Sequence, residues 1–291
     1  MNLLDIRNLS IELIGENKNI LAVDKVSLSM KEGEVRGLVG ESGSGKSLLA
    51  QAIVGVLDDK WHVHADRFHW RGIDLLRLPM EERKALLSRD IAMIFQEPMA
   101  CLDPTTTIGE QLSEAIDAST LTGFFWQKQQ QRHSAAIKLL HKVGIKSHSN
   151  CLNSYPHQLT EALCQRVMIA IALARRPILL IADEPTAAME NTNQGQIFRL
   201  LASLNQLKSM SILLISHDLE NITHWTHTIT VMYSGQFVEA GTTEQIFKKP
   251  LHPYTRALVD SSPSANVHLP AKSRLMTLPG SIPILQHLPI G

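Results

Sequence analysis

The sequence predicts an α/β fold with a mainly parallel sheet, interrupted by an inserted helical subdomain. Two observations lead to this prediction. Short apolar runs, each long enough for one buried strand, alternate with helical patterns, as is typical of parallel sheets (residues 35–39, 91–95, 178–182 and 212–215). Between residues 97 and 154, by contrast, the pattern predicts helices and offers no long strand candidate.

Composition excludes several classes of protein. The 291 residues are 44% apolar, and the 28 basic and 28 acidic residues cancel, which argues against a strongly basic nucleic-acid binder. Three widely spaced cysteines form no disulfide framework, so a reducing compartment is expected. No apolar run approaches the roughly 18 residues of a membrane helix, and Asp5 and Arg7 interrupt the first apolar stretch, unlike a signal peptide. We therefore expect a soluble, cytoplasmic protein that reaches a membrane only by docking on another component.

The elements follow in order from the hydrophobic pattern. Strands are predicted at 3–13, 21–30, 35–39 and 91–95, with a turn at 31–34 and a first helix at 47–57. Helices are predicted next at 108–117, 127–143 and 160–176, separated by proline and glycine. A strand at 178–182, a helix at 194–204 and a strand at 212–215 complete the core. After a short helix at 254–259, the proline-rich tail is expected to be extended.

The loop after the strand at 35–39 has a phosphate-binding motif. It fits G-x-x-x-x-G-K-[ST] in full with Gly40, Glu41, Ser42, Gly43, Ser44, Gly45, Lys46 and Ser47. Glycines let backbone N–H groups wrap a phosphate, and the following helix N-terminus favours negative charge. Lys46 is predicted to reach the β- and γ-phosphates of ATP, and the Ser47 hydroxyl to ligate Mg²⁺. The alternative is a glycine-rich turn without a ligand, which the complete motif between a strand and a helix disfavours.

Two carboxylates follow the apolar strand at 178–182. Ligands of parallel sheets bind at such strand ends, so Asp183 is predicted to hold Mg²⁺ through water. Glu184 is predicted to polarise the water that attacks the γ-phosphate. A pair of solvated acids at a strand end is the alternative, and the phosphate loop makes it the weaker one.

Four further stretches resemble motifs of the ABC-transporter ATPases. They are Met93-Ile94-Phe95-Gln96-Glu97-Pro98 (Q-loop), Tyr155-Pro156-His157-Gln158-Leu159 (before the signature segment), Asp183-Glu184-Pro185-Thr186-Ala187-Ala188-Met189-Glu190 (Walker B and D-loop) and Ile215-Ser216-His217-Asp218 (switch histidine). Their order and spacing match over nearly the whole chain. The resemblance implies a P-loop NTPase fold of the ABC type, an α/β nucleotide-binding domain with an antiparallel β-subdomain and an inserted helical subdomain. The expected division is 1–96 for the core, antiparallel subdomain and phosphate loop, 97–176 for the helical subdomain, 177–250 for the rest of the core and 251–291 for a C-terminal extension.

The resemblance also implies residue roles and partners. Gln96 is expected to sense Mg²⁺ and the attacking water, and His217 to contact the γ-phosphate. Two ATPase subunits would pair head to tail, so that each ATP lies between the phosphate loop of one and the signature segment of the other, here Thr160 and Glu161. The helical subdomain would dock on two transmembrane permeases. A periplasmic substrate-binding protein is an indirect partner, and no nucleic acid is expected.

Three segments resemble the oligopeptide/dipeptide-uptake branch of this family: Ala22-Val23-Asp24, Tyr155-Pro156-His157 and His252-Pro253-Tyr254-Thr255-Arg256-Ala257-Leu258. The branch implies ATP hydrolysis that drives peptide uptake, including antimicrobial peptides, at the cytoplasmic face of a bacterial inner membrane. The alternatives are a weakly hydrolytic regulatory subunit, an ATPase for small-amine (polyamine) transport and a non-transport ABC ATPase. A single cassette and zero net charge disfavour the last of these.

The signature segment departs from the family's usual Leu-Ser-Gly-Gly-Gln. Here it is Leu-Thr-Glu-Ala-Leu at 159–163, so Thr160 keeps a hydroxyl but both glycines are missing. Glu161 brings a carboxylate towards the partner's ATP; at about 6 Å and an effective dielectric constant of about 20, each like-charge pair costs about 3 kcal/mol. Arg166 lies five residues further along the predicted helix, on a different face. We therefore expect slow turnover of the partner's ATP, unless Glu161 points away.

Other features leave alternatives open. The chain has no aromatic residue before Trp61, so we expect weaker nucleotide binding or stacking of adenine on an aliphatic side chain such as Ile20. Glu190 stands where the D-loop usually has aspartate. A metal site at His62, His64 and His69 lacks a completing ligand cluster, so a solvated strand edge is favoured. The aromatic run at 124–126 is interpreted either as core or as a groove for a permease helix.

Overall fold

The computed structural model describes residues 2–15, 19–186 and 191–262. The chain forms two compact units, Met1–Ala85 with Ser211–Gly291, and Leu86–Met210. The boundary at residue 85 falls inside helix α2 (Met80–Asp90).

The first unit contains two sheets and the helices beside them. Its elements are β1 (Asn2–Leu13), β2 (Ile20–Lys31), β3 (Val35–Val39), α1 (Lys46–Val54), β4 (Trp61–His64), β5 (Arg67–Trp70), β6 (Ile73–Asp74), β9 (Ser211–Ser216), α9 (Leu219–Thr223), β10 (Thr228–Tyr233), β11 (Gln236–Thr242), α10 (Thr243–Lys248) and α11 (Pro253–Asp260). The second unit contains β7 (Ile91–Ile94), α3 (Pro98–Cys101), α4 (Ile108–Ala115), η1 (Ala118–Thr120), α5 (Phe125–Lys142), α6 (His148–Asn153), η2 (Pro156–Gln158), α7 (Glu161–Ala174), β8 (Leu179–Asp183) and α8 (Asn191–Lys208).

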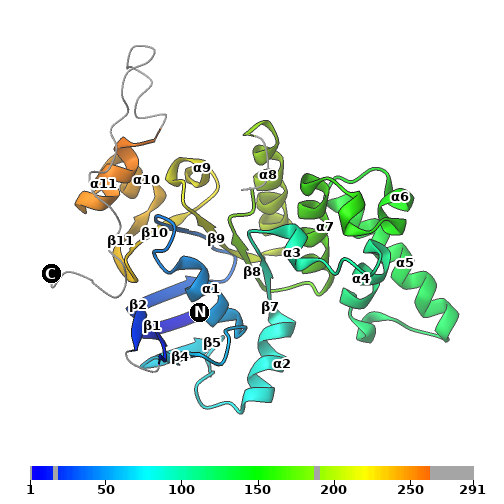
Figure 1. Ribbon diagram of the computed structural model, residues 1–291, viewed down its shortest axis with the longest axis horizontal. Coiled ribbons are helices and arrows are strands. Elements are labelled where there is room, and N and C mark those ends of the chain that lie inside the picture. The colour runs from blue at the N-terminus through cyan, green and yellow to red at the C-terminus, as the bar shows by residue number, and fades with distance from the viewer. Residues whose placement is uncertain (1, 16–18, 187–190, 263–291) are drawn as a thin grey trace. The chain divides into compact units, whose positions relative to one another are not determined.

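One sheet of the first unit is antiparallel throughout. Strand β1 lies between β2 on one side and β4 and β5 on the other (Figure 1). Strand β5 also pairs with β6. Leu4 lies opposite Trp70, and Ile6 lies opposite Phe68, and these side chains are buried almost completely. The alternation of polar and apolar residues in β1 and β2 thus buries one face of the sheet, as a half-buried antiparallel sheet requires.

The other strands of the first unit put the phosphate loop at a shared edge. Strand β3 pairs in parallel with β9 and with β10, and β11 adds antiparallel to β10. The register sets Val39, the last residue of β3, opposite Ser216 and also opposite Val231. Because parallel strands end at the same edge, the loop that begins at Gly40 and the residue after Ser216 emerge side by side.

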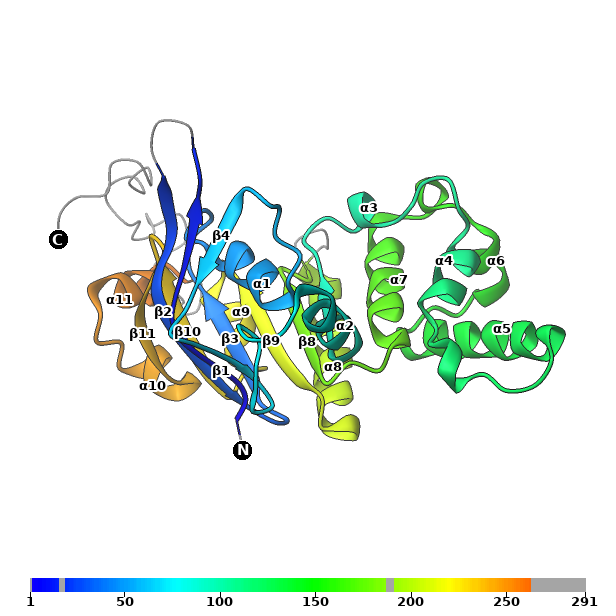
Figure 2. The same cartoon turned by 90° about the horizontal axis from the view of Figure 1, so that it is seen from below.

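The second unit is a strand pair with a helical bundle. Strands β7 and β8 are parallel, with Ile94 opposite Ala182. Helices α3, α4 and α5 all pack against α7 (Figure 2). The apolar side chains that α7 buries, Val167, Ile169 and Leu173 among them, form the centre of this bundle. Helix α4 begins at a capping box, in which Thr107 and Glu110 satisfy each other's backbone N–H groups.

The predicted α/β class is confirmed, and the predicted strands and helices are present with ends that shift by a few residues. The proline-rich tail beyond residue 262 lies outside the described residues. The short strands β4 to β6, helix α2 and the β10–β11 hairpin were not predicted.

Candidate functional site

The geometry of the phosphate loop requires glycine at positions 40 and 45. A side-chain carbon at Gly40 would collide with the backbone carbonyl oxygen of Met232, so the close approach of β10 excludes any larger residue. Gly45 is the N-cap of α1 and adopts φ 102°, in the left-handed region that other residues rarely enter. The loop is therefore shaped by contact with β10 and turns directly into α1.

Lys46 is held against its own loop. Its side chain is 5% exposed, and Nζ donates hydrogen bonds to the carbonyl oxygens of Gly40 and Glu41, both at 2.7 Å. A third contact, to Ser44 Oγ, is 3.2 Å long. Three oxygen partners compensate the burial of this ammonium group.

The remaining loop residues and the predicted switch histidine lie in the same unit. Ser42 and Gly43 are exposed, Ser47 is half-buried in the first turn of α1, and His217 is an exposed residue directly after β9. The pairing of Val39 with Ser216 places Gly40 and His217 at one edge of the sheet.

The predicted catalytic acid and the Q-loop glutamine meet in the second unit. Asp183 is the last residue of β8 and is 4% exposed, and Glu184 follows it with φ 45°. Gln96, two residues after β7, donates a hydrogen bond from Nε2 to Glu184 Oε2 at 3.2 Å. A left-handed glutamate is uncommon, and such backbone strain gathers at functional sites.

The signature segment forms the N-terminus of α7. Thr160 is the N-cap, and its Oγ1 accepts a hydrogen bond from the Leu163 N–H at 3.3 Å. Glu161 is exposed and occupies the first turn, where a carboxylate is favoured by the helix dipole. Arg166 does not offset its charge, because the guanidinium donates instead to the Val143 carbonyl and to Gln196 Oε1, both at 2.6 Å.

Comparison with known proteins identifies the class to which these motifs belong. Residues 23–187 match the family described as "ABC transporter". The chain belongs to the ABC transporter family. As an ABC ATPase, it binds ATP and its function is to energise transport.

Relatives in this family resemble the chain over its whole length. The peptide transport system ATP-binding protein SapD of Escherichia coli O6:H1 is 54% identical over 291 residues, which is 100% of this chain and 88% of the relative. The dipeptide transport ATP-binding protein DppD of Escherichia coli K12 is 45% identical over 97% of this chain and 84% of its own length. Residues 238–291 match a second family, described as "Oligopeptide/dipeptide transporter, C-terminal region".

A solved ABC cassette has the same fold. The ATP-binding cassette MJ0796, determined as a dimer in a post-hydrolysis state with ADP and Pi, superimposes with a TM-score of 0.70 at 25% identity. The alignment covers 82% of this chain and 98% of that cassette. The ABC-type nucleotide-binding fold inferred from the sequence motifs is therefore confirmed.

Sequence reasoning missed two contacts beside the motif residues, one in each unit. In the second unit, Gln165 of α7 is 1% exposed and donates from Nε2 to the Pro185 carbonyl at 2.9 Å, next to Glu184. In the first unit, the Glu41 N–H donates to the Tyr254 hydroxyl of α11 at 2.9 Å. A polar residue inside an apolar helix face was the only signal for Gln165, and the pairing of Glu41 with Tyr254 has no local sequence signal.

The histidines at 62, 64 and 69 do not form a metal site. His62 and His64 are exposed on β4, and His69 lies 3.9 Å from Asp74. Within 2–15, 19–186 and 191–262, no group of three or more His, Cys, Asp or Glu side chains could hold a metal ion. Glu190 of the D-loop falls outside the described residues.

The aromatic run at the start of α5 is a surface feature, and its interpretation as core was wrong. Phe124, Phe125 and Trp126 are 68%, 82% and 68% exposed. The rings of Phe124 and Trp126 stack with their centroids 5.3 Å apart, so the run presents one apolar surface. Exposed apolar patches of this kind mark interaction sites.

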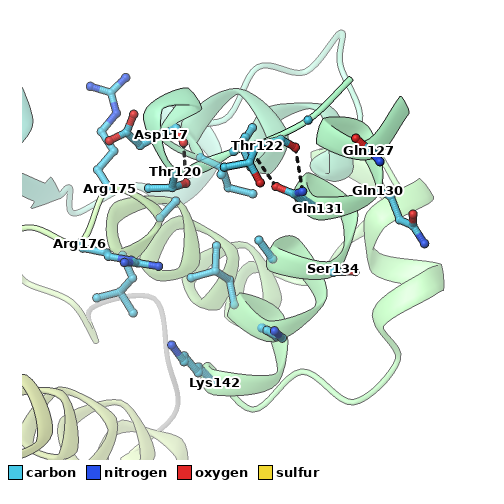
Figure 3. A pocket seen from close by; sticks show the side chains of 18 residues that line it. Asp117, Thr120, Thr122, Gln127, Gln130, Gln131, Ser134, Lys142, Arg175 and Arg176 are labelled. Carbon is cyan, nitrogen blue, oxygen red and sulfur yellow. Dashed lines mark hydrogen bonds between the residues drawn. The ribbon is translucent and has the colours of Figure 1, made fainter. Parts of the chain in front are cut away.

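A pocket runs along α5 within the same unit (Figure 3). Gly123 and Gln127, which flank the aromatic run, line one part of it, and the cations Lys138, Lys142, Arg175 and Arg176 line another. Gln131 fixes the wall by hydrogen bonds to the Thr122 N–H and carbonyl. None of the predicted nucleotide-site residues lines this pocket.

Proposed function

We propose that the chain is the ATP-binding subunit of an ABC importer and hydrolyses ATP to drive peptide uptake, antimicrobial peptides included. The observation that carries this proposal is the 54% identity, over the whole chain, to a relative named for peptide transport. The match of residues 238–291 to the C-terminal region of oligopeptide/dipeptide transporters supports the same substrate class.

The proposed nucleotide site uses the phosphate loop and a magnesium ion. Backbone N–H groups of the loop bind the phosphates, and Lys46 exchanges its longest contact, to Ser44 Oγ, for a phosphate oxygen while it keeps its bond to the Gly40 carbonyl. Ser47, Asp183 and Gln96 offer hydroxyl, carboxylate and amide oxygens, the hard donors that Mg²⁺ prefers, and Asp183 is already shielded from water at the end of β8. With Mg²⁺ bound, the phosphate charge is partly neutralised.

Glu184 is proposed to accept a proton from the attacking water. Its carboxylate is held by Gln96 Nε2, so the glutamine orients the base and links its position to the segment that enters the helical subdomain. His217, at the edge next to the phosphate loop, is proposed to donate a hydrogen bond to the γ-phosphate. These groups act by positioning and by stabilising charge, which dominate catalysis of phosphoryl transfer.

We propose that the two composite sites of the ATPase dimer are unequal. The Thr160 oxygen accepts from the helix, so its hydroxyl proton remains able to donate to the partner's ATP. The Glu161 carboxylate opposes that ATP, and Arg166 has other partners. The site that contains this chain's phosphate loop therefore turns over faster than the partner's site. We also propose that this chain binds adenine weakly, because no aromatic residue precedes Trp61, and that the base stacks on an aliphatic side chain such as Ile20.

The proposed partners are a second ABC ATPase subunit, two transmembrane permeases and, indirectly, a periplasmic substrate-binding protein. We place the chain peripherally at the cytoplasmic face of the inner membrane, where the exposed surface at 124–126 contacts a permease. In the part of the chain that the structure describes, no helix is both long and apolar enough to cross a bilayer. We also propose that the helical subdomain begins at residue 97, that the core resumes at residue 177 and that the C-terminal extension begins at residue 251.

The test is reconstitution of this chain with its partner ATPase, the permeases and the binding protein in vesicles. We expect ATP hydrolysis and uptake of a labelled peptide that depend on each other, and no uptake of labelled putrescine. Uptake of putrescine without peptide would favour the polyamine alternative and overturn the peptide assignment. Peptide uptake that persists when this chain's ATP site is inactivated would favour the regulatory alternative.

A further inference from the structure

One peptide group of the phosphate loop is held from both sides. The Gly40 carbonyl accepts a hydrogen bond from Lys46 Nζ at 2.7 Å, and the Glu41 N–H donates to the Tyr254 hydroxyl at 2.9 Å. This carbonyl and this N–H belong to the same planar peptide unit, in which they point in opposite directions. Tyr254 therefore lies on the far side of the loop from Lys46.

The C-terminal helix that presents Tyr254 is itself anchored. Glu239 of β11 accepts hydrogen bonds from the N–H groups of Leu251 and His252, each at 2.9 Å. His252 Nδ1 then caps α11 by accepting from the Tyr254 N–H at 3.2 Å, and Pro253 occupies the first turn, where its missing N–H costs nothing. The start of α11 is thus fixed to β11 before the tyrosine reaches the loop.

The tyrosine ring is also fixed. Tyr254 is 7% exposed, and its ring packs against Tyr233, with centroids 4.5 Å apart and planes at 46°. Tyr233 directly follows Met232, whose carbonyl oxygen lies against Gly40. Burial raises the pKa of Tyr254 to about 12, so the hydroxyl is neutral in the cell. A half-buried N–H that loses such a partner carries part of the desolvation cost of an unsatisfied donor.

We propose that Tyr254 is a positioning residue of the ATP site, which fixes the Gly40–Glu41 peptide and so sets the direction of the carbonyl that holds Lys46. The inference rests on the proposed binding of ATP by this loop. It assigns a task to the C-terminal region: α11 acts as a brace behind the phosphate loop. Without the hydroxyl the peptide can rotate, and nucleotide binding must then restore its orientation.

The test compares Tyr254→Phe with Tyr233→Phe in the full chain. Both variants keep their rings and lose one hydroxyl, but the structure shows a bond to the loop only for Tyr254. We expect Tyr254→Phe to raise the dissociation constant of a fluorescent ATP analogue by up to about tenfold, the net value of one hydrogen bond. In the assembled complex the KM for ATP rises by a similar factor and kcat stays within twofold. Tyr233→Phe leaves both constants unchanged.

Two further readouts separate positioning from general destabilisation. With ¹⁵N-glutamate labelling, the Glu41 amide resonance shifts in Tyr254→Phe and not in Tyr233→Phe. If Tyr254→Phe does not fold, Glu239→Gln, which weakens the anchor of α11 at a distance from the loop, is expected to raise the dissociation constant by a few-fold. Wild-type affinity in folded Tyr254→Phe, or in Glu239→Gln, overturns the inference. Absence of ATP binding by the wild-type chain would instead contradict the proposed function.

Discussion

Gln96 Nε2 and Glu184 Oε2 are joined by a hydrogen bond of 3.2 Å across 88 residues of sequence. The pairing of Ile94 with Ala182 in the parallel strands β7 and β8 brings the two side chains together. Glu184 has φ 45°, a conformation that costs free energy for a residue with a side chain. The amide of Gln96 is one of the groups that fix the carboxylate in this orientation.

Replacing Glu184 with glutamine should abolish turnover without loss of ATP binding. The amide cannot accept a proton from water, and general bases of this kind contribute about 10²- to 10⁴-fold to a rate. The measurement is MgATP hydrolysis by the complete complex. Its matched control is the corresponding change in the partner ATPase, which should be tolerated if this chain's phosphate loop forms the faster site. Turnover that survives Glu184→Gln would contradict the proposed asymmetry.

Lys46→Ala should weaken ATP binding by roughly 10- to 100-fold, because each charge-assisted hydrogen bond is worth about 1.5–3 kcal/mol. Calorimetry with ATP in the absence of Mg²⁺ measures the contribution of Lys46 to the free energy of ATP binding without any contribution from the metal. Lys60→Ala, a change at an exposed lysine in the same unit, is the control and should bind as wild type does. If Lys46→Ala and the wild type bind ATP with equal affinity, Lys46 does not contact the phosphates and the phosphate loop is not the ATP-binding site.

Glu161→Gln should accelerate hydrolysis at the partner's ATP. To observe that site alone, the change is made in a chain that already contains Glu184→Gln. Removal of a like charge worth about 3 kcal/mol at close range predicts a rise of roughly 10- to 100-fold, less any screening by solvent. The cost to α7 is only a few tenths of a kcal/mol, from the loss of one favourable helix-dipole contact. An unchanged residual rate would mean that Glu161 points away from the nucleotide.

Glu34→Gln should lower the stability of the protein at neutral pH. Burial alone raises the pKa of Glu34, but hydrogen bonds from Thr228 Oγ1 (2.6 Å) and the Lys31 N–H (2.8 Å), with Arg36 nearby, hold it below the ordinary value. A lowered pKa means that the stabilisation exists above the ordinary glutamate pKa of about 4.3 and is lost as the pH falls through the folded value.

Urea unfolding at several pH values measures this effect. Glu34→Gln should be less stable than wild type by about 2 kcal/mol at pH 7, and the difference should shrink as the pH falls below about 4. Glu32→Gln, which removes an exposed carboxylate two residues away, is the control and should follow the wild type. A difference that is constant over the whole pH range would mean that the charge of Glu34 contributes nothing.

The double variant Phe125→Ser, Trp126→Ser should impair assembly without affecting the fold. Both side chains are exposed, so the unfolding free energy should change by no more than about 0.5 kcal/mol. Copurification with the permeases is the measurement. Leu251→Ser, a change at an apolar side chain that is 84% exposed in the other unit, is the control. Normal recovery of the permeases with the double variant would exclude this surface as a docking site.

The long elements could be predicted because their patterns are strong. The phosphate-binding motif lies between β3 and the first turn of α1, and it indicates both elements. Helix α7 is indicated by an apolar face that extends over about four turns. Strands β4 to β6 span only two to four residues each, and β5 alternates charged or polar residues with Phe68 and Trp70, so their sheet is defined by pairing with β1 and not by local pattern. Strand β11 is half-exposed and mixed in composition, which conceals it in the same way.

In the candidate site, too, the residues with a strong local pattern could be predicted, and the contacts that depend on tertiary structure could not. The residues of the phosphate loop, the acids after β8 and the glutamine after β7 are recognisable because each follows an apolar strand. The bond between Gln96 and Glu184 depends on strand register, and the bond between Glu41 and Tyr254 on the return of the chain after 213 residues. The sequence left open whether Phe125 lies in the core or at an interface, because a run of aromatic side chains has the same composition in both places, and only the structure shows that it is exposed.

Arg166 joins the C-terminal end of α5 to α7. Its guanidinium clamps the carbonyl of Val143 at the C-terminal end of α5, while its own backbone belongs to α7. Helix α5 has 18 residues and is therefore a stiff rod of about 27 Å, with the aromatic run at its far tip. The bond of Arg166 therefore couples the aromatic surface, through the length of α5, to the helix that begins at Thr160.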